Sequence, residues 1–189
     1  MNNAKQSRLA GIAALGLFAV FGMEPIQADE RTCVGTLGGI TVDNLRVPSG
    51  KTCTLNTTRV KGTIKVERNA TLYARTVSVI GNVQAENAAL VSVTSNSTVG
   101  GSIQIKQGGA ATINRVKVTG DIQFESNTQP LRALYNRVGG NLQAFQNRGG
   151  VRIAYNTIDG NLQCKENVPA PTGGSNIVRG NKEDQCRRL

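Results

Sequence analysis

The sequence predicts an all-β protein built as one right-handed parallel β-helix, a solenoid of about seven coils. Two observations carry this prediction: a glycine recurs every 19 or 20 residues, and apolar and polar residues alternate after each of these glycines. The glycines stand at positions 62, 81, 101, 120, 140, 160 and 180. A fixed period of this length indicates stacked repeats. The usual handedness of parallel crossovers favours a right-handed helix.

The residues after each glycine indicate a strand with one buried face. The second and fourth residues are apolar, as in Ile64 and Val66, and the residues between them are polar. Successive side chains of a strand point to opposite faces, so this alternation indicates a strand rather than a helix. We expect the polar first position to point outward; its residues are Asn82, Ser102, Asp121, Asn141 and Asn161.

The first 28 residues have the pattern of a signal peptide. Lys5 and Arg8 precede an apolar stretch over residues 9–23, and a small residue, Ala28, stands at the expected cleavage site. A membrane anchor is the alternative, but the apolar stretch is short for a membrane-spanning helix. We therefore expect a bacterial protein that is secreted or periplasmic after cleavage near Ala28, with no transmembrane segment in the mature chain.

The remaining chain divides into three parts by its pattern. Residues 29–61 form an N-terminal cap and a first irregular coil, residues 62–179 form the β-helix repeats, and residues 180–189 form a C-terminal cap or tail. A solenoid exposes strand edges at both ends, and these need caps. Residues 167–176 contain two prolines and two glycines, which predicts a loop in place of a strand.

Four cysteines in an exported chain predict two disulfide bonds. Three pairings are possible from the count alone. We expect Cys33 to pair with Cys53 and Cys164 with Cys186, because any other pairing would join opposite ends of the rod. The cysteines have no Cys-x-x-Cys spacing and the chain has no histidine, so we assign no metal site and no cofactor.

Two columns of asparagine align over the last three coils, at Asn127, Asn147 and Asn167 and at Asn136, Asn156 and Asn176. Asparagine tolerates the left-handed backbone that corners require, and stacked amides can bond from coil to coil. We expect these columns to be structural. Tyr135 and Tyr155 also align, which is typical of packing.

The repeats "VGGNLQA" and "IDGNLQC" resemble those of bactofilins, which are polymer-forming right-handed β-helices of bacteria. They are also similar to the broader class of pectate-lyase-like β-helices. The resemblance covers residues 60–180. It implies two alternative functions, a self-assembling scaffold and a polysaccharide lyase or hydrolase. Bactofilins are cytoplasmic and have no capping disulfides, so these caps favour a monomer over a polymer.

The formal net charge of +10 fits either an anionic partner or a charged surface that only confers solubility. The basic residues that align or lie close in the repeats are Arg115, Lys117, Arg132, Arg137, Arg148 and Arg152. We expect a non-catalytic structural or binding protein for acidic polysaccharide, lipopolysaccharide, a cell surface, a protein partner or, without sequence preference, nucleic acid. The lack of tryptophan argues against recognition by ring stacking. For the basic columns themselves, a charged coat that only confers solubility is the slightly favoured explanation.

An enzyme on this rod would need converging acidic groups. Calcium requires several oxygen ligands, and a hydrolase requires two carboxylates at a set separation. Glu67, Glu86 and Glu125 share one column with Lys106 and Lys165, a pattern typical of a surface charge ladder. Glu125 and Asp121 are the nearest candidate pair, and no long insertion encloses them. We therefore assign no catalytic residue.

Overall fold

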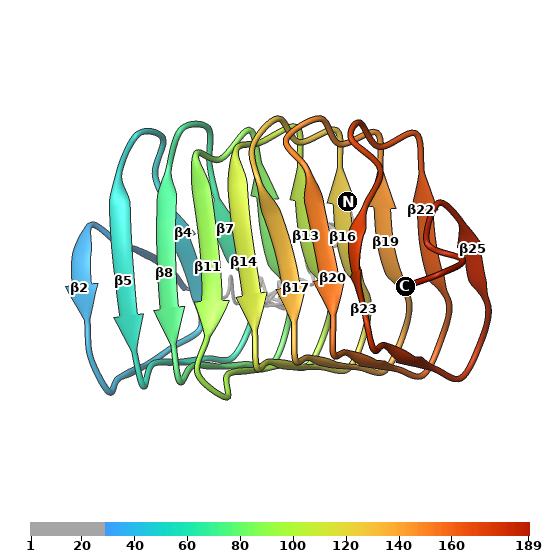
Figure 1. Ribbon diagram of the computed structural model, residues 1–189. Coiled ribbons are helices and arrows are strands. Elements are labelled where there is room, and N and C mark those ends of the chain that lie inside the picture. The colour runs from blue at the N-terminus through green and yellow to red at the C-terminus, as the bar shows by residue number, and fades with distance from the viewer. Residues whose placement is uncertain (1–28) are drawn as a thin grey trace, which may run out of the picture.

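The computed structural model describes residues 29–189, which wind into eight coils of parallel strands stacked along one axis (Figure 1). The predicted signal peptide lies outside the described residues. Each coil contributes one strand to each of three sheets, called A, B and C in the order in which the chain visits them. Among residues 29–189 there is no helix long and apolar enough to cross a membrane.

The strands are short, and their bounds follow the repeat. Sheet A contains β1 (Glu30–Thr32), β4 (Asn44–Val47), β7 (Ile64–Val66), β10 (Val83–Glu86), β13 (Ile103–Lys106), β16 (Ile122–Glu125), β19 (Leu142–Phe145), β22 (Leu162–Lys165) and β25 (Lys182–Asp184). Sheet B contains β2 (Gly35–Leu37), β5 (Thr52–Asn56), β8 (Thr71–Arg75), β11 (Leu90–Thr94), β14 (Ala110–Asn114), β17 (Leu131–Leu134), β20 (Val151–Ala154) and β23 (Thr172–Gly174). Sheet C contains β3 (Thr41–Val42), β6 (Arg59–Val60), β9 (Ser78–Val79), β12 (Thr98–Val99), β15 (Lys117–Val118), β18 (Arg137–Val138), β21 (Thr157–Ile158) and β24 (Ile177–Val178).

The predicted fold class is confirmed. Equivalent residues pair in register from coil to coil, as Val83 does with Ile103 and Ile103 with Ile122. In Figure 1 the strands of sheet B descend at the front and those of sheet A ascend at the back as the chain advances from left to right, which is a right-handed winding.

The segment before Gly62 differs from the prediction of one irregular coil. It forms two coils, β1–β3 and β4–β6, so the rod has eight turns. The alternation that supports this continues through Leu45, Val47 and Leu55, all buried. The glycine alignment missed it because Asp43 stands in the glycine column, opposite Gly62 in the register of β4 and β7.

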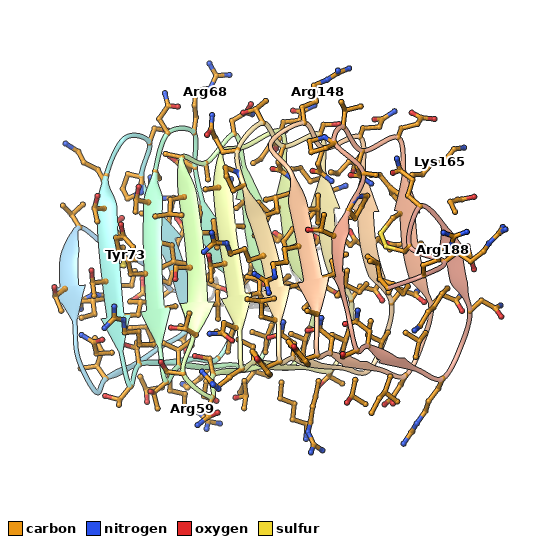
Figure 2. All side chains as sticks on the ribbon, viewed as in Figure 1. Arg59, Arg68, Tyr73, Arg148, Lys165 and Arg188 are labelled. Carbon is orange, nitrogen blue, oxygen red and sulfur yellow. A yellow bond between two sulfur atoms is a disulfide. The ribbon has the colours of Figure 1, made fainter. Side chains whose placement is uncertain are left out.

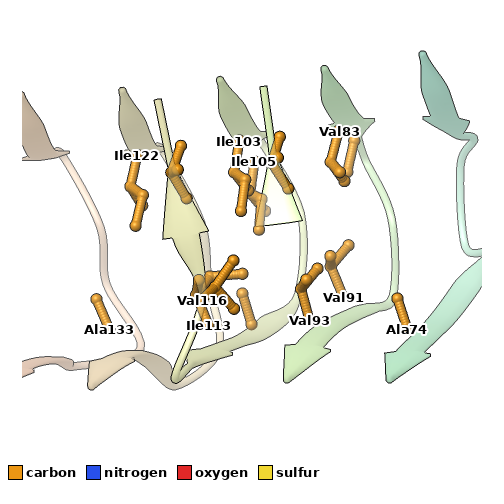
Figure 3. Close-up of a cluster of buried hydrophobic side chains, with 14 of the residues drawn as sticks. Ala74, Val83, Val91, Val93, Ile103, Ile105, Ile113, Val116, Ile122 and Ala133 are labelled. Carbon is orange, nitrogen blue, oxygen red and sulfur yellow. The ribbon is translucent and has the colours of Figure 1, made fainter. Parts of the chain in front are cut away.

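The core is a continuous column of aliphatic side chains inside the rod. Ile103, Ile113 and Ile122 are completely buried, and their neighbours in the third to sixth coils fill the space between the sheets (Figure 3). Each inward position in one coil lies on the same position in the next. The burial of apolar surface in this stack is the main force that holds the coils together, and each Å² removed from water contributes about 25 cal/mol.

The periodic glycine makes room at the corner between sheets C and A. A Cβ atom at Gly140 would collide with the side chain of Asp121 and the backbone of Gly120 in the preceding coil. The polar residue after each glycine uses this space, so it is half-buried rather than outward-facing as predicted. Asn141, for example, accepts a hydrogen bond from the backbone N–H of Asn161 at 2.8 Å. The same contact recurs without a gap from Asn44 to Asn181, although the side chain that accepts the hydrogen bond is an asparagine, threonine, serine or aspartate in different coils.

The other two corners turn through a residue with positive φ, and in the last three coils it is not the asparagine that we expected there. Gln146 and Tyr155 have φ of 56° and 58°, and the asparagine that follows each of them points inward. The reason is hydrogen bonding: the turn leaves backbone groups inside the rod that need partners. A short amide next to the turn reaches them, whereas a left-handed asparagine side chain would point to solvent.

Two amide ladders result, and we name them by their corners. The A–B ladder contains Asn127, Asn147 and Asn167; the B–C ladder contains Asn136, Asn156 and Asn176. The Nδ2 group of Asn147 donates to the carbonyl of Phe124 at 3.0 Å and to Oδ1 of Asn167 at 2.9 Å. The A–B ladder ends at Gln185 in the tail, whose Oε1 accepts from Nδ2 of Asn167 at 3.0 Å.

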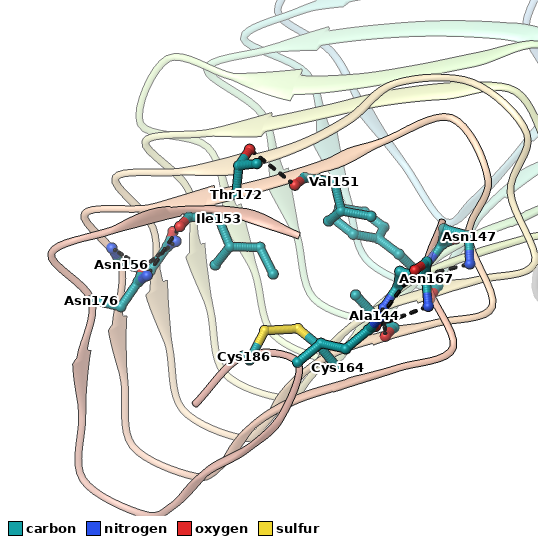
Figure 4. The surroundings of a disulfide bond; sticks show 12 residues. Ala144, Asn147, Val151, Ile153, Asn156, Cys164, Asn167, Thr172, Asn176 and Cys186 are labelled. Atoms are coloured by element: carbon teal, nitrogen blue, oxygen red, sulfur yellow. Dashed lines mark hydrogen bonds between the residues drawn. A yellow bond between two sulfur atoms is a disulfide. The ribbon is translucent and has the colours of Figure 1, made fainter. Parts of the chain in front are cut away.

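Both disulfides lie at the ends of the rod, with Cys33 bonded to Cys53 and Cys164 to Cys186, as we expected. Figure 4 shows the second bond between the two amide ladders, where it fixes the tail across the last coil. Disulfides of this kind indicate an oxidising compartment. The predicted loop over residues 167–176 is wrong in part, because Thr172–Gly174 forms β23. Backbone pairing tolerates the glycines there.

A candidate anion-binding face

Five of the six predicted anion-binding residues lie at three neighbouring places on the rod. Arg132 and Arg152 are register neighbours on sheet B, and both are exposed. Lys117 and Arg137 are register neighbours on sheet C and are also exposed. Arg115 lies at the corner between these two sheets, in the fifth coil. The structure therefore gathers five of the six residues around one edge of the rod.

Arg148 does not belong to this group. It lies at the corner between sheets A and B, where its backbone N–H donates to Asn127. Figure 2 shows Arg148 at the upper edge of the rod, whereas Arg59 of sheet C projects from the lower edge. Sequence alignment could not separate the two edges, because Arg148 is only four residues from Arg152.

The acidic residues are distributed unevenly around the rod. We call sheets B and C with the corner between them the basic face. This face carries no aspartate or glutamate among the described residues, and its basic residues are Arg59, Arg75, Arg115, Lys117, Arg132, Arg137 and Arg152. Of the 12 acidic residues in the chain only Glu24 precedes residue 29, so the other 11 all lie on sheet A or at its two flanking corners.

Ion pairing follows the same division. The salt bridges formed by the described residues all involve sheet A or its flanking corners, for example Lys106 with Glu125 at 2.8 Å and Arg179 with Asp159 at 3.1 Å. No basic side chain of the basic face takes part in one. Stacked guanidinium groups one coil apart, such as those of Arg132 and Arg152, repel each other and are relieved by an anion.

Two tyrosines form an exposed stack at the centre of the basic face. The rings of Tyr135 and Tyr155 are 4.8 Å apart with an angle of 6° between their planes, and each residue is about half exposed (48% and 49%). The guanidinium carbon of Arg115 lies 5.2 Å from the Tyr135 ring centroid. The alignment of the two tyrosines was visible in the sequence, but their exposure depends on the left-handed turn.

A shallow hollow adjoins this stack. It is lined by Asn96, Ser97, Arg115, Val116, Lys117, Tyr135 and Arg137. Three of these residues are cationic, and the others are polar or aromatic apart from Val116. Such a lining suits an anionic group that also presents a flat or polar surface.

Sheet A offers different chemistry. Glu125 is paired with Lys106, and Asp121 accepts the backbone N–H of Asn141 through Oδ1, so both members of the candidate hydrolase pair make structural contacts. Among residues 29–189 no three histidine, cysteine or acidic side chains lie close enough to hold a metal. Hydrogen bonds from the Ser49 hydroxyl and then the Ser49 backbone N–H lower the pKa of Glu67, with help from Arg46.

No family model, curated protein or solved structure matches this chain. The geometry and charge of the rod itself are therefore the basis on which a function is proposed.

Proposed function

We propose that this protein is an exported, non-catalytic β-solenoid that binds an anionic polymer or polymer-coated surface along its basic face, as a secreted or periplasmic monomer. The observation that carries this proposal is the separation of charge, with every described acidic residue on or beside sheet A. A charged coat for solubility needs no such separation.

The spacing of the charges also fits a polymer. Five of the seven basic residues of this face lie in the fifth to seventh coils, which span about 10 Å along the axis at the usual distance between strands. The backbone beneath them is fixed by hydrogen bonds in all three sheets. Cationic groups held in rows meet the repeating charges of a polyanion with little loss of conformational freedom on binding.

Binding to three polyanions, namely polygalacturonate, polyphosphate and single-stranded oligothymidylate, tests this function at two salt concentrations. We expect Arg132→Glu with Arg152→Glu to weaken binding of at least one polymer about tenfold at low salt, because favourable contacts become repulsive. The matched control is Lys65→Glu with Arg68→Glu on the sheet A side, which changes the net charge equally at two exposed residues.

The proposed function requires the two double variants to differ. If both weaken binding equally, the protein responds only to net charge, and the basic face is a coat. If none of the three polymers binds at low salt, the proposal is wrong.

A further inference from the structure

We propose that the polymer is single-stranded nucleic acid and that the stack of Tyr135 and Tyr155 is where its bases bind. This inference rests on the proposed function, since it names the polymer for the same face. Its observation is separate: an exposed aromatic stack, bordered by cations, that ends in an open ring face.

The stack is built by the repeat and stops abruptly. Arg115, Tyr135, Tyr155 and Ser175 occupy the same corner position in four successive coils, with φ between 55° and 58°. The first three contribute a flat guanidinium and two rings. Ser175 contributes only a hydroxymethyl group and is exposed, so the outer face of Tyr155 has no ring next to it. A planar base placed over Ser175 would continue the stack by one step.

The residues beside the proposed base position over Ser175 are small or apolar. The neighbouring positions in the eighth coil are Gly174 on sheet B, beside which a Cβ would meet open space, and Ile177 on sheet C, which is 66% exposed. On the sheet B side, where Gly174 lies, no side chain would block a flat ligand. On the sheet C side, the exposed apolar side chain of Ile177 can pack against the edge of a base and so be removed from water.

Cations border the stack on both sides. Arg132 and Arg152 run along sheet B, and Lys117 and Arg137 run along sheet C. A strand lying along the corner would place its phosphates near these rows while its bases reach the tyrosines. Proteins that bind single strands without sequence preference combine these two features, a positive track and aromatic side chains on which bases stack.

A polysaccharide uses the face differently. Its charged groups would pair with the same guanidinium and ammonium groups, but a sugar ring is puckered and offers Tyr155 only its C–H edges. A planar base covers the whole ring face of Tyr155, so the open end of the stack suits nucleic acid better than a uronate polymer. The observations therefore favour nucleic acid.

Intrinsic fluorescence gives a direct readout, because the chain has three tyrosines and no tryptophan. The oxidised protein is titrated with oligothymidylate and, separately, with polygalacturonate, and tyrosine emission is corrected for absorption by the oligonucleotide. We expect oligothymidylate to quench the emission and polygalacturonate to leave it unchanged. Tyr155→Ser, which copies the next coil, should weaken oligothymidylate binding about tenfold, as expected for one stacked base.

Tyr73→Ala is the matched control, since Tyr73 is exposed on sheet B away from the stack. It should leave oligothymidylate affinity unchanged while the remaining emission still responds. If Tyr155→Ser binds as tightly as the parent protein, or if polygalacturonate binds more tightly than oligothymidylate, the inference is overturned. Binding of either polymer that depends on Arg132 and Arg152 would still support the proposed function, so the two failures are distinguishable.

Discussion

The corners of the first five coils and those of the last three fill the inside of the turn with different residues. In the first part the inward corner positions hold small or apolar side chains, namely Thr58, Ala70, Val77, Ala88, Ser97, Gly108 and Val116. In the last part the same positions hold the six ladder asparagines. At these positions the backbone turns alike in both parts, through a residue with positive φ directly before the inward one.

This difference shows that the asparagines are not what makes the corner. A corner closes with a small side chain in the core or with an amide that bonds to the buried backbone. The two solutions differ in how they respond to loss of a side chain. A missing methyl group leaves a small void, whereas a missing amide leaves several buried polar groups without partners.

The largest expected effect comes from removing one amide at the middle of the A–B ladder. Asn147→Ala removes the partners of the Phe124 carbonyl and of the Asn127 amide groups, all inside the rod. We expect the free energy of unfolding to fall by about 3–4 kcal/mol, since each orphaned group costs about 1–3 kcal/mol. Equilibrium unfolding in urea measures this.

Ser97→Ala in the first part is the control for Asn147→Ala. Ser97 bonds the Thr94 carbonyl and the Val77 N–H, so its loss should cost about 1–2 kcal/mol. Equal losses for the two variants would mean that the ladder does no more than fill space.

A smaller effect compares the two ends. Replacing Cys164 and Cys186 by alanine should cost about 3 kcal/mol by the chain-entropy model, as should replacing Cys33 and Cys53, because the two loops are of similar length. Only the first change also releases Gln185 from the ladder. Hydrogen exchange should therefore become faster at the Asn167 N–H after loss of the C-terminal bond alone. Protection that is unchanged there would contradict the role of Gln185 as the end of the ladder.

The smallest effect concerns acid and the first part of the rod. The folded protein lowers the pKa of Glu67 below its usual value of 4.5, through Ser49 first and Arg46 in addition. A lowered pKa means that the stabilisation is complete above pH 4.5 and is lost as the pH falls through the folded value. Glu67→Gln should therefore flatten the decrease in melting temperature below pH 4.5.

Glu86→Gln, in the same column, is the control for Glu67→Gln, because its carboxylate has no hydrogen-bond partner among the described residues. A decrease in melting temperature that remains as steep in Glu67→Gln as in the parent protein would show that the contacts with Ser49 contribute nothing.

Much of the fold could be predicted from the sequence because its causes are local. The period and the alternation predict parallel coils, and the cysteine positions predict both disulfides. The first two coils were merged because Asp43 stands where the later coils have the periodic glycine. The inward turn of the asparagines was missed because residue type does not distinguish the turn from its neighbour.

The site was harder to predict because it depends on which residues share a face. The sequence contains the signal, since no acidic residue falls between the start of a sheet B strand and the end of the following sheet C strand. This is apparent only when the strand boundaries are known. The exposure of Tyr155 likewise follows from a backbone angle that its residue type does not suggest.

The amide ladders have a consequence for how the rod can change in evolution. Asn147 and Asn156 each meet an identical residue before and after them, so a duplicated twenty-residue coil in this region would find a matching partner on both sides. The rod could lengthen by about 4.8 Å with each duplication while both ends stay as they are. Because the asparagines of one coil match those of the next, the last coils can be duplicated without loss of these hydrogen bonds. A longer rod would present a longer basic face.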